Sequence, residues 1–476
     1  MKRIIASTLL LAFVALLGAV AQDEEAEAPQ GEGSNTDFGL GITIGAQSFP
    51  NPDYDGTDAT DKTVTYQSVG LTPDIGIGKF GLGLDLTLNY RFTGGDGTEF
   101  EVRAADWVPD DDTTFLELYL PKLRYVRWAQ KGDPLYILLG QVDNGLLGNG
   151  FIMGGYTNTQ FLPDRRIFGM SFDVDGALFD FPFVGIETFV GNLAVFDLIG
   201  SRLYVRPLAG TGLPIVRNLQ IGGTIATDLK PFHYVEDELA DSPTASVSDF
   251  LPAGTSQSAA RALVWGTDFR LPVLNNDAIS LAGFGDYVNQ NGNSGGMLGI
   301  GGRLFRVMTY GAQLRFLGEN FIPVYFDGAY DLFRHRKYAV YAGVDGFTTD
   351  PYVGWFASTG FSLLDDQLVF TANVDGPFGG ADPDDTFKQP HLLATFMLGE
   401  GILGGFSVEA SYDKKGIEDF ADLINPEDSV IGARVNYRIE SATISLVYDL
   451  QYDPFPEPGD DPWIITSKVE TAITLF

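Results

Sequence analysis

The sequence has no cysteine, only three histidines, and about half as many basic as acidic residues, 30 against 63. The absence of cysteine excludes a disulfide framework and a lipid-modified cysteine as membrane anchor. Without cysteine or clustered histidine we expect no catalytic zinc site. His233, His335 and His391 lie far apart and accompany no nucleophile motif, so we expect neither an enzyme nor a cofactor.

The scarcity of basic residues leaves a formal net charge of −33. Such a charge repels the phosphate backbone, so it argues against a nucleic-acid partner. It also concentrates cations near the protein, which favours cationic over anionic solutes. Charge by itself says nothing about the fold.

Long hydrophobic runs are missing after residue 21, although 45% of all residues are hydrophobic. No later segment reaches the roughly 18 apolar residues that a transmembrane helix needs. Residues 1–21 combine a basic start, an apolar run and the small residues Ala19 and Ala21, which predicts a secretory signal peptide. A single membrane anchor is the alternative, disfavoured by the short run and the acidic residues that follow. We expect residues 22–37 to form a flexible acidic periplasmic leader.

The apolar residues are instead dispersed in alternation, most clearly in residues 80–92, FGLGLDLTLNYRF. Every even position carries a large apolar residue, and the odd positions carry small, polar or charged ones. Because strand side chains alternate between two faces, this segment has one apolar and one polar wall. Soluble strands usually stop after about five or six residues, whereas crossing a bilayer takes about 9–11. The segment therefore predicts a membrane-spanning strand.

Similar alternating segments follow one another over residues 38–476. Residues 431–439 and 444–452 flank the dipeptide Glu440-Ser441, which predicts a hairpin. The alternation at residues 324–332 likewise predicts a strand, followed by a short turn at 333–337. We predict an all-β fold: one transmembrane antiparallel up-and-down β-barrel of about 22 strands, within a range of 18–22.

The lengths of the connections alternate in the same order. Connections such as 78–79, 207–214, 272–278, 364–367 and 440–441 are short. The long ones are 50–62, 93–113, 143–163, 228–258, 375–389, 413–428 and 453–461, and most are acidic. Short periplasmic turns and long extracellular loops are typical of outer-membrane barrels. In a soluble β-sandwich, short and long connections are not expected to alternate in this way between the two ends of the sheet.

The alternating segment 463–475 ends in Phe476, which resembles the assembly signal of bacterial outer-membrane proteins, including the porins. One departure from that pattern is that the large apolar residues here stand in the other register. The composition, which is acidic and rich in aromatic residues and glycine, resembles that of a porin-type protein of a spirochaete or similar diderm. The resemblance does not extend to a particular subfamily. This resemblance implies a cell outer-membrane location, contact with outer-membrane lipid, recognition of Phe476 by the assembly machinery, and passage of small solutes. Monomer and trimer are both compatible with the sequence.

The residues opposite each apolar wall are the candidates for lining a pore. They are Asp85, Asn89, Arg91, Arg165, Asp173, Arg202, Arg206, Asp268, Arg270, Arg315, Arg434, Arg438 and Asp449. The set resembles the opposing basic and acidic ladders of general porins, and such rings set ion selectivity. The alternative is a polar wall stabilised by cross-strand ion pairs.

Segment 143–163, DNGLLGNGFIMGGYTNTQFLP, is the one long connection that is apolar and glycine-rich. A loop of this composition is not expected to stay in water. We predict that it folds into the lumen as the constriction, with Leu147, Asn149, Phe151, Met153 and Tyr156 as candidate residues. The alternatives are a loop packed over the rim or a distorted strand pair. The acidic loops lack an EF-hand spacing, so we expect them to be solvated and to hold no metal.

These patterns favour a porin-type channel for passive diffusion of small hydrophilic solutes, biased toward cations. A transporter for hydrophobic substrates, similar to the fatty-acid barrels, is the first alternative, and polar inward positions count against it. A surface adhesin without transport, working through the acidic loops, is the second.

Overall fold

The computed structural model describes residues 36–51, 63–93, 98–109, 113–162, 165–234, 246–305, 307–364, 366–379, 388–417, 419, 421–423, 429–440, 442–452 and 463–474. The predicted signal peptide, most of the predicted leader and Phe476 lie outside these residues. Thr36 and Asp37, assigned to the leader from the sequence, already belong to the first strand.

Within the described residues, 22 strands form one antiparallel sheet. They are β1 (Thr36–Pro50), β2 (Thr63–Ile77), β3 (Phe80–Leu84), β4 (Leu86–Thr93), β5 (Glu99–Val102), β6 (Leu123–Trp128), β7 (Leu135–Gly140), β10 (Gly169–Asp175), β11 (Val184–Val190), β12 (Leu198–Val205), β13 (Gln220–Asp228), β14 (Ala262–Asn275), β15 (Ile279–Gln290), β16 (Asn293–Leu304), β17 (Met308–Leu317), β18 (Tyr352–Leu363), β19 (Leu368–Pro377), β20 (His391–Leu403), β21 (Phe406–Lys414), β22 (Ser429–Ile439), β23 (Ala442–Tyr452) and β24 (Trp463–Thr474). A separate small sheet consists of β8 (Gly145–Leu147) and β9 (Met153–Tyr156).

Helices are few and short. The α-helices are α2 (Phe115–Tyr119) and α4 (Tyr330–Ala342), and the 3-10 helices are η2 (Ala104–Asp106), η3 (Leu120–Lys122), η4 (Gly176–Phe179), η5 (Val216–Asn218), η6 (Val247–Phe250) and η7 (Gln257–Ala259). Among the described residues, no helix is both long and apolar enough to cross a membrane.

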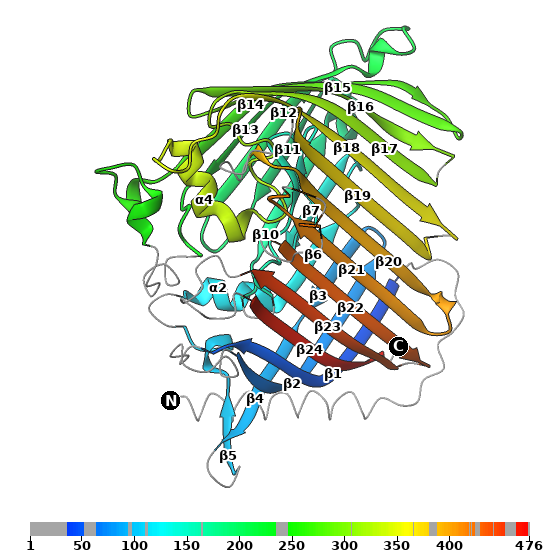
Figure 1. Ribbon diagram of the computed structural model, residues 1–476. Helices are drawn as coiled ribbons and strands as arrows, with labels where there is room; N and C mark the ends of the chain where they lie inside the picture. The colour runs from blue at the N-terminus through cyan, green and yellow to red at the C-terminus, as the bar shows by residue number, and fades with distance from the viewer. Residues whose placement is uncertain are drawn as a thin grey trace.

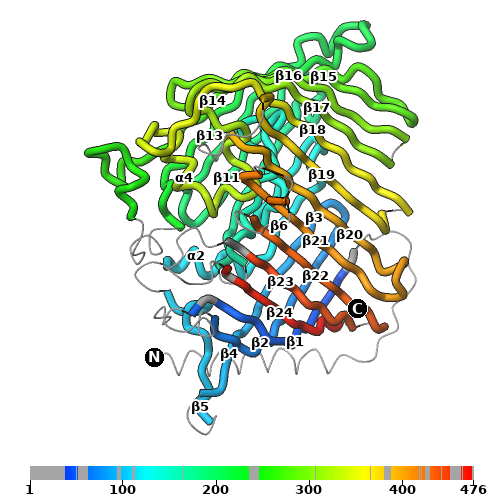
Figure 2. Tube along the Cα trace, in the orientation of Figure 1, coloured from blue at the N-terminus to red at the C-terminus, as the bar shows by residue number. Residues whose placement is uncertain are grey.

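The sheet closes on itself because β1 pairs with both β2 and β24, with Gly41 opposite Thr474 (Figures 1 and 2). β3 and β4 follow one another along β2, so they are two halves of one bent strand. β6 pairs with β3 and β5 pairs with β4, so β5 and β6 likewise share one position in the wall. When strands that share one position are counted once, the barrel wall has 20 strands. This is the closed antiparallel barrel predicted from the alternation.

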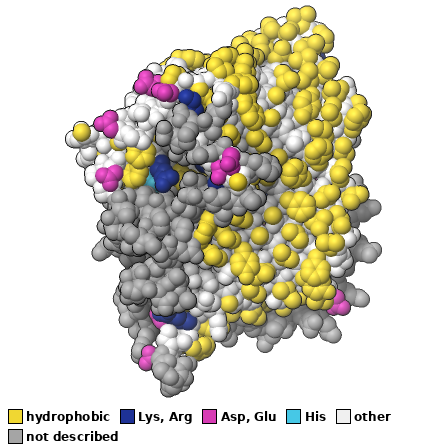
Figure 3. Space-filling model, in the orientation of Figure 1, with side chains coloured by type: hydrophobic (Ala, Val, Ile, Leu, Met, Phe, Trp, Pro, Cys, Tyr) yellow, Lys and Arg dark blue, Asp and Glu magenta, His cyan; other side chains and the backbone are white. Residues whose placement is uncertain are grey.

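Large apolar side chains are exposed on the outer face of the wall. Leu203 on β12 is 59% exposed and Leu298 on β16 is 56% exposed, while their neighbours Arg202 and Met297 point inward and are buried. Figure 3 shows apolar side chains covering the strand-bearing side, with charged residues gathered toward the long-loop end. An apolar outer wall of this kind is what a lipid bilayer requires. The predicted membrane-spanning barrel is therefore confirmed.

The two ends of the barrel differ as the loop lengths predict, with four departures. Connections 78–79, 276–278, 305–307, 364–367 and 404–405 are tight turns at one end, called here the short-turn rim. At the other end, the long-loop end, connections 191–197 and 291–292 are unexpectedly short. Connections 176–183 and 206–219, on the short-turn rim, are longer than the short turns that the sequence predicts at 175–176 and 207–214. Short and long connections therefore alternate in most of the barrel wall, but not in all of it.

The predicted strand at residues 324–332 is wrong. The structure places these residues in connection 318–351 between β17 and β18, where they lead into α4. Tyr330, Tyr338 and Val340 are almost fully buried, and so are the basic residues Arg334 and Lys337. A helix that is buried on all sides has no solvent-exposed polar face. The sequence therefore lacks the alternation of polar and apolar residues, with a period of 3.6, by which amphipathic helices are predicted.

Connections 141–168 and 318–351 pack together inside the barrel, and we call them the plug. The amide of Phe326 donates to the carbonyl oxygen of Ile152 at 3.1 Å, and the amide of Gly154 donates to the carbonyl oxygen of Phe326 at 3.2 Å. Side chains of the plug share one core with inward-facing residues of β13 to β16, namely Ala226, Val264, Val288 and Met297. The plug therefore lies against one side of the inner wall.

Candidate functional site

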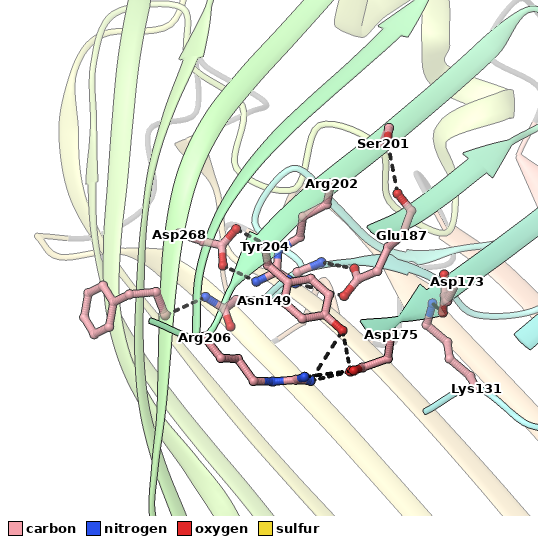
Figure 4. Close-up of polar contacts among 12 residues, drawn as sticks. Lys131, Asn149, Asp173, Asp175, Glu187, Ser201, Arg202, Tyr204, Arg206 and Asp268 are labelled. Atoms are coloured by element: carbon pink, nitrogen blue, oxygen red, sulfur yellow. Dashed lines mark hydrogen bonds and ion pairs between the residues drawn. The ribbon is translucent and has the colours of Figure 1, made fainter. Parts of the chain in front are cut away.

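A cross-strand cluster of charges lies on the inner wall at β11, β12 and β14 (Figure 4). Arg202 donates Nε and Nη2 to the two carboxylate oxygens of Asp268, at 2.9 and 2.6 Å. Its Nη1 donates to Glu187 Oε1 at 2.9 Å. Both Arg202 and Asp268 are almost completely buried, at 2% and 6% exposure. Bidentate pairing of a guanidinium with a carboxylate fixes both groups in one orientation.

Two glycines make room for this cluster. Gly222 on β13 lies between Arg202 and Asp268, and a Cβ there would stand only 2.5 Å from Asp268 Oδ2 and 2.6 Å from Arg202 Nε. Gly148 at the tip of the plug has a φ of +59°, and a Cβ there would stand 2.9 Å from Arg202 Nε. The absence of side chains at these two positions therefore lets the ion pair form across β13 and lets the plug approach it.

The tip of connection 141–168 is bound to the same wall. The amide of Gly148 donates to Glu187 Oε2 at 2.9 Å. Asn149 Nδ2 donates to Asp286 Oδ2 at 2.9 Å and to the Phe269 carbonyl oxygen at 3.1 Å. The other candidate residues of this loop, Leu147, Phe151, Met153 and Tyr156, are buried in the shared core.

Further polar pairs continue along the inner wall toward the short-turn rim (Figure 4). Lys131 Nζ lies 2.9 Å from Asp173 Oδ2. Arg206 and Tyr204 both donate to Asp175 Oδ2, at 2.5 and 2.8 Å. The predicted residues Asp173, Arg202, Arg206 and Asp268 therefore lie on one side of the lumen, together with Asn149.

A second chain of charges runs across β17, β19, β20 and β21. Arg315 Nη1 lies 2.7 Å from Asp375 Oδ2, and Asp375 Oδ1 lies 3.1 Å from His391 Nδ1. His391 Nε2 is 2.7 Å from Asp413 Oδ1. Arg315 also lies over the Phe151 and Phe356 rings, at 5.9 and 4.7 Å from their centroids. Through Arg315 on β17, this chain of charges therefore also contacts the plug at Phe151.

The predicted residues near the start of the chain form a separate group. Asp85 pairs with Arg166 and accepts from Thr87 Oγ1 at 2.6 Å. Asn89 Nδ2 donates to Asp106 Oδ2 at 2.9 Å, and Arg91 Nε donates to Glu101 Oε2 at 2.8 Å.

Arg165 is placed apart from both groups, at the aromatic rings of the plug and the long-loop end. Its guanidinium carbon lies 5.9 Å from the Phe161 ring centroid and 5.5 Å from the Tyr234 ring centroid. It therefore does not join the basic residues of the inner wall.

Of the remaining candidates, Arg434, Arg438 and Asp449 lie on β22 and β23, away from the strands that share a core with the plug. Arg434 on β22 is exposed and stands opposite Glu409 of β21, which is exposed as well. Asp449 on β23 is half-buried. Arg270 lies within β14, two residues beyond Asp268, and is exposed. Arg438 lies near the short-turn rim, with Nη1 3.4 Å from Glu400 Oε2.

The charges that hold α4 are not among the site residues predicted from the sequence. Arg334 is fully buried, with Nη1 2.9 Å from Asp197 Oδ2 and Nη2 2.7 Å from Asp228 Oδ2. Lys337 Nζ lies 2.9 Å from Asp327 Oδ2. α4 is therefore tied to the ends of β12 and β13. The available signal was the basic run Arg334–Lys337 in a chain poor in basic residues, which we interpreted as a surface turn.

Burial changes the ionisation of these groups. It raises the pKa of Asp331 to about 7, although nearby Arg334 acts in the opposite direction. It lowers the pKa of Lys337 to about 8, against the attraction of Asp327. Within the described residues, no group of three or more acidic, histidine or cysteine side chains is arranged to hold a metal ion.

The inner wall as a whole can orient charged and polar solutes, since it presents both signs of charge at fixed positions. What it can do chemically is bind reversibly and discriminate by charge.

No protein-family model matches the chain, and no curated protein matches it. Solved structures do match it over most of its length. The chain is similar to OccK2 (OpdF) of Pseudomonas aeruginosa, at 9% identity and a TM-score of 0.31, over 92% of this chain and 98% of that one. It is similar to a BenF-like porin of Pseudomonas fluorescens, at 13% identity and a TM-score of 0.35, over 93% and 99%.

A third similar structure is Wzi of Escherichia coli, an outer-membrane protein involved in group 1 capsule assembly and described as a carbohydrate-binding β-barrel. It has 12% identity and a TM-score of 0.31, over 91% of this chain and 84% of that one. At these values the likeness is one of barrel architecture alone.

Proposed function

We propose that the protein is an outer-membrane channel for passive diffusion of small hydrophilic solutes, with a preference for cations. The observation that carries this proposal is the contrast between the two sides of the inner wall. Inward-facing polar residues on β12 to β14, such as Arg202, Thr224 and Asp268, are buried beneath the plug. Inward-facing Thr395, Glu409 and Arg434 on β20 to β22 are exposed.

Exposed polar side chains that point into a barrel line a water-accessible space. A barrel of 16 or more strands is wide enough to hold such a space beside an inserted loop. Solutes would pass between the plug and the wall of β19 to β23. The polar character of this wall supports hydrophilic solutes over hydrophobic ones. The net charge of −33 supports the preference for cations.

The test is reconstitution into planar bilayers, with and without a KCl gradient. The proposal predicts discrete conductance steps and a reversal potential of the sign given by potassium selectivity. Silent insertion of folded protein would exclude the channel, and a reversal potential of the opposite sign would exclude only the cation preference.

Glu409→Gln sharpens the test of selectivity. Removing an exposed carboxylate from the open wall should move the reversal potential toward zero. The matched control is Glu440→Gln, which removes the same charge from a turn at the short-turn rim. Equal shifts in both variants would contradict a selective role for the open wall.

A further inference from the structure

One sector of the short-turn rim carries exposed apolar side chains that do not belong to the strands. In connection 176–183 these are Leu178, Phe179 and Phe181, and in connection 206–219 they are Leu213 and Ile215. Phe179 is 70% exposed and Leu213 is 56% exposed. Figure 1 shows connection 206–219 as the projection at the top of the barrel, clear of the long loops at the left.

The two connections form one packed unit, which we call the foot. The amide of Arg206 donates to the Phe183 carbonyl oxygen at 2.7 Å. The Arg206 side chain donates to the Pro182 carbonyl oxygen at 3.2 Å and pairs with Asp175 at 2.5 Å. Gly210 approaches the Phe183 ring so closely that a Cβ would stand 3.3 Å from it. These contacts fix the foot in place, with its apolar side chains outward.

The apolar surface of the foot is continuous with the lipid-facing surface of the wall. Phe183 runs directly into Val184, the first residue of β11, and Val205 ends β12 directly before Arg206. Val184, Val205 and, at the start of β13, Ile221 are all exposed on the outer face. No polar strip therefore separates the membrane-facing wall from the foot along these strands.

Two other connections of the same rim are polar. Connection 78–79 carries the exposed Lys79, and connection 129–134 carries the exposed Gln130 and Lys131. Exposed apolar side chains also occur in other turns of this rim, as at Phe305 and Leu364, so the foot is distinguished by gathering five of them in two connections that pack together.

We propose that the foot inserts among the phospholipids of the inner leaflet, as an anchor that extends the membrane contact of the barrel beyond its strands. Phe and Leu side chains suit the boundary between headgroups and acyl chains. The exposed Arg217, on η5 beside Ile215, suits a phosphate group. The unit protrudes instead of forming a groove, which fits a fluid lipid better than a folded partner. This inference depends on the barrel lying in a membrane, and not on conduction.

Because the chain has no cysteine, an introduced cysteine is the only thiol that a fluorescent label can modify. Leu213→Cys and Phe179→Cys each give one site for a polarity-sensitive fluorophore, and Gln130→Cys gives the control in a polar turn of the same rim. Each variant is refolded into phospholipid vesicles, and its barrel is verified by circular dichroism. The probes are a nitroxide on the lipid acyl chains and iodide in the aqueous phase.

The proposal predicts a blue-shifted emission at positions 179 and 213. It also predicts strong quenching by the acyl-chain nitroxide and little quenching by iodide. The label at position 130 should show the reverse. If the labels at 179 and 213 behave like the label at 130, the foot lies in water and the proposal is overturned.

Shielding by a second copy of the chain would also overturn the proposal. In that case neither quencher would reach the labels at 179 and 213, and dilution of the protein in the vesicles would restore quenching by iodide. Two labelled positions ensure that a local distortion at one of them does not decide the result. None of these readouts requires the barrel to conduct, so failure here is distinct from failure of the proposed channel.

Discussion

Single residues of this barrel act mainly through buried pairs of opposite charge. Breaking such a pair by removing one partner leaves an uncompensated charge in a medium of low dielectric constant, which is far more costly than losing an exposed pair. Arg202 is the clearest case, because its one guanidinium holds both Asp268 and Glu187.

Arg202→Met should therefore lower the free energy of unfolding by about 3–5 kcal/mol. The measurement is urea-induced unfolding of the protein refolded into vesicles. The matched control is Arg438→Met, whose pair with Glu400 is largely exposed and should contribute about 0–1 kcal/mol. Similar losses in the two variants would mean that the Arg202 pair is not buried as described.

A second residue-scale prediction concerns pH. Burial raises the pKa of Asp331 to about 7, and Asp197 adds to that rise while Arg334 opposes it. An aspartate in the unfolded chain has a pKa of about 3.9. The folded state thus keeps a proton that the unfolded state releases, so this contribution to stability is present below about pH 3.9 and is lost as pH rises through about 7.

Asp331→Asn keeps a neutral group at this position at every pH. We expect the variant to gain stability relative to the parent between about pH 4 and pH 7, with the gain levelling off above that range. Unfolding midpoints measured at several pH values test this, and the difference between the two proteins isolates Asp331 from other titrating groups. A difference that does not change with pH would contradict the raised pKa.

At the scale of elements, the plug determines which part of the lumen is open. Deleting residues 148–155 removes the tip that binds Glu187 and Asp286. It also removes three of the four residues of β9, which packs on the segment before α4. If the plug narrows the passage, the deletion should raise the single-channel conductance.

The control is deletion of residues 253–255, which lie mostly exposed in connection 229–261 and should leave conductance unchanged. An unaltered conductance in the deletion of 148–155, with the barrel still folded, would show that this loop is not the constriction.

The elements also show how far sequence reasoning reaches. Alternation located most strands and the inward side of Arg202, Asp268 and Arg315, because one face of each strand contacts lipid. It could not pair them, since the pairing of Arg202 with Asp268 depends on strand register and on Gly222 between them. It failed at α4 because Val324, Phe326, Tyr330 and Leu332 alternate by coincidence, and a helix enclosed by protein carries no amphipathic period.

For the whole molecule, the division of side chains between lipid and lumen predicts that an introduced charge destabilises the barrel by different amounts on the two faces of the wall. Leu298→Arg places a charge on the lipid-facing wall and should cost about 2–4 kcal/mol if the position lies near the bilayer centre. Thr395→Arg places the same charge on the open inner wall and should cost much less. The measurement is again urea unfolding in vesicles, and equal costs would contradict the assignment of the two faces.

The pairing of β1 with β24 has a consequence for the time course of folding. It joins residues 41–47 to residues 468–474, so the last contact to form spans nearly the whole chain. Contacts of such sequence separation carry a large loop-closure entropy and slow the approach to the native state. Until they form, both strands present unpaired edges, which are prone to aggregation. We therefore expect slow closure after early hairpin formation, and a need for chaperoning during that interval.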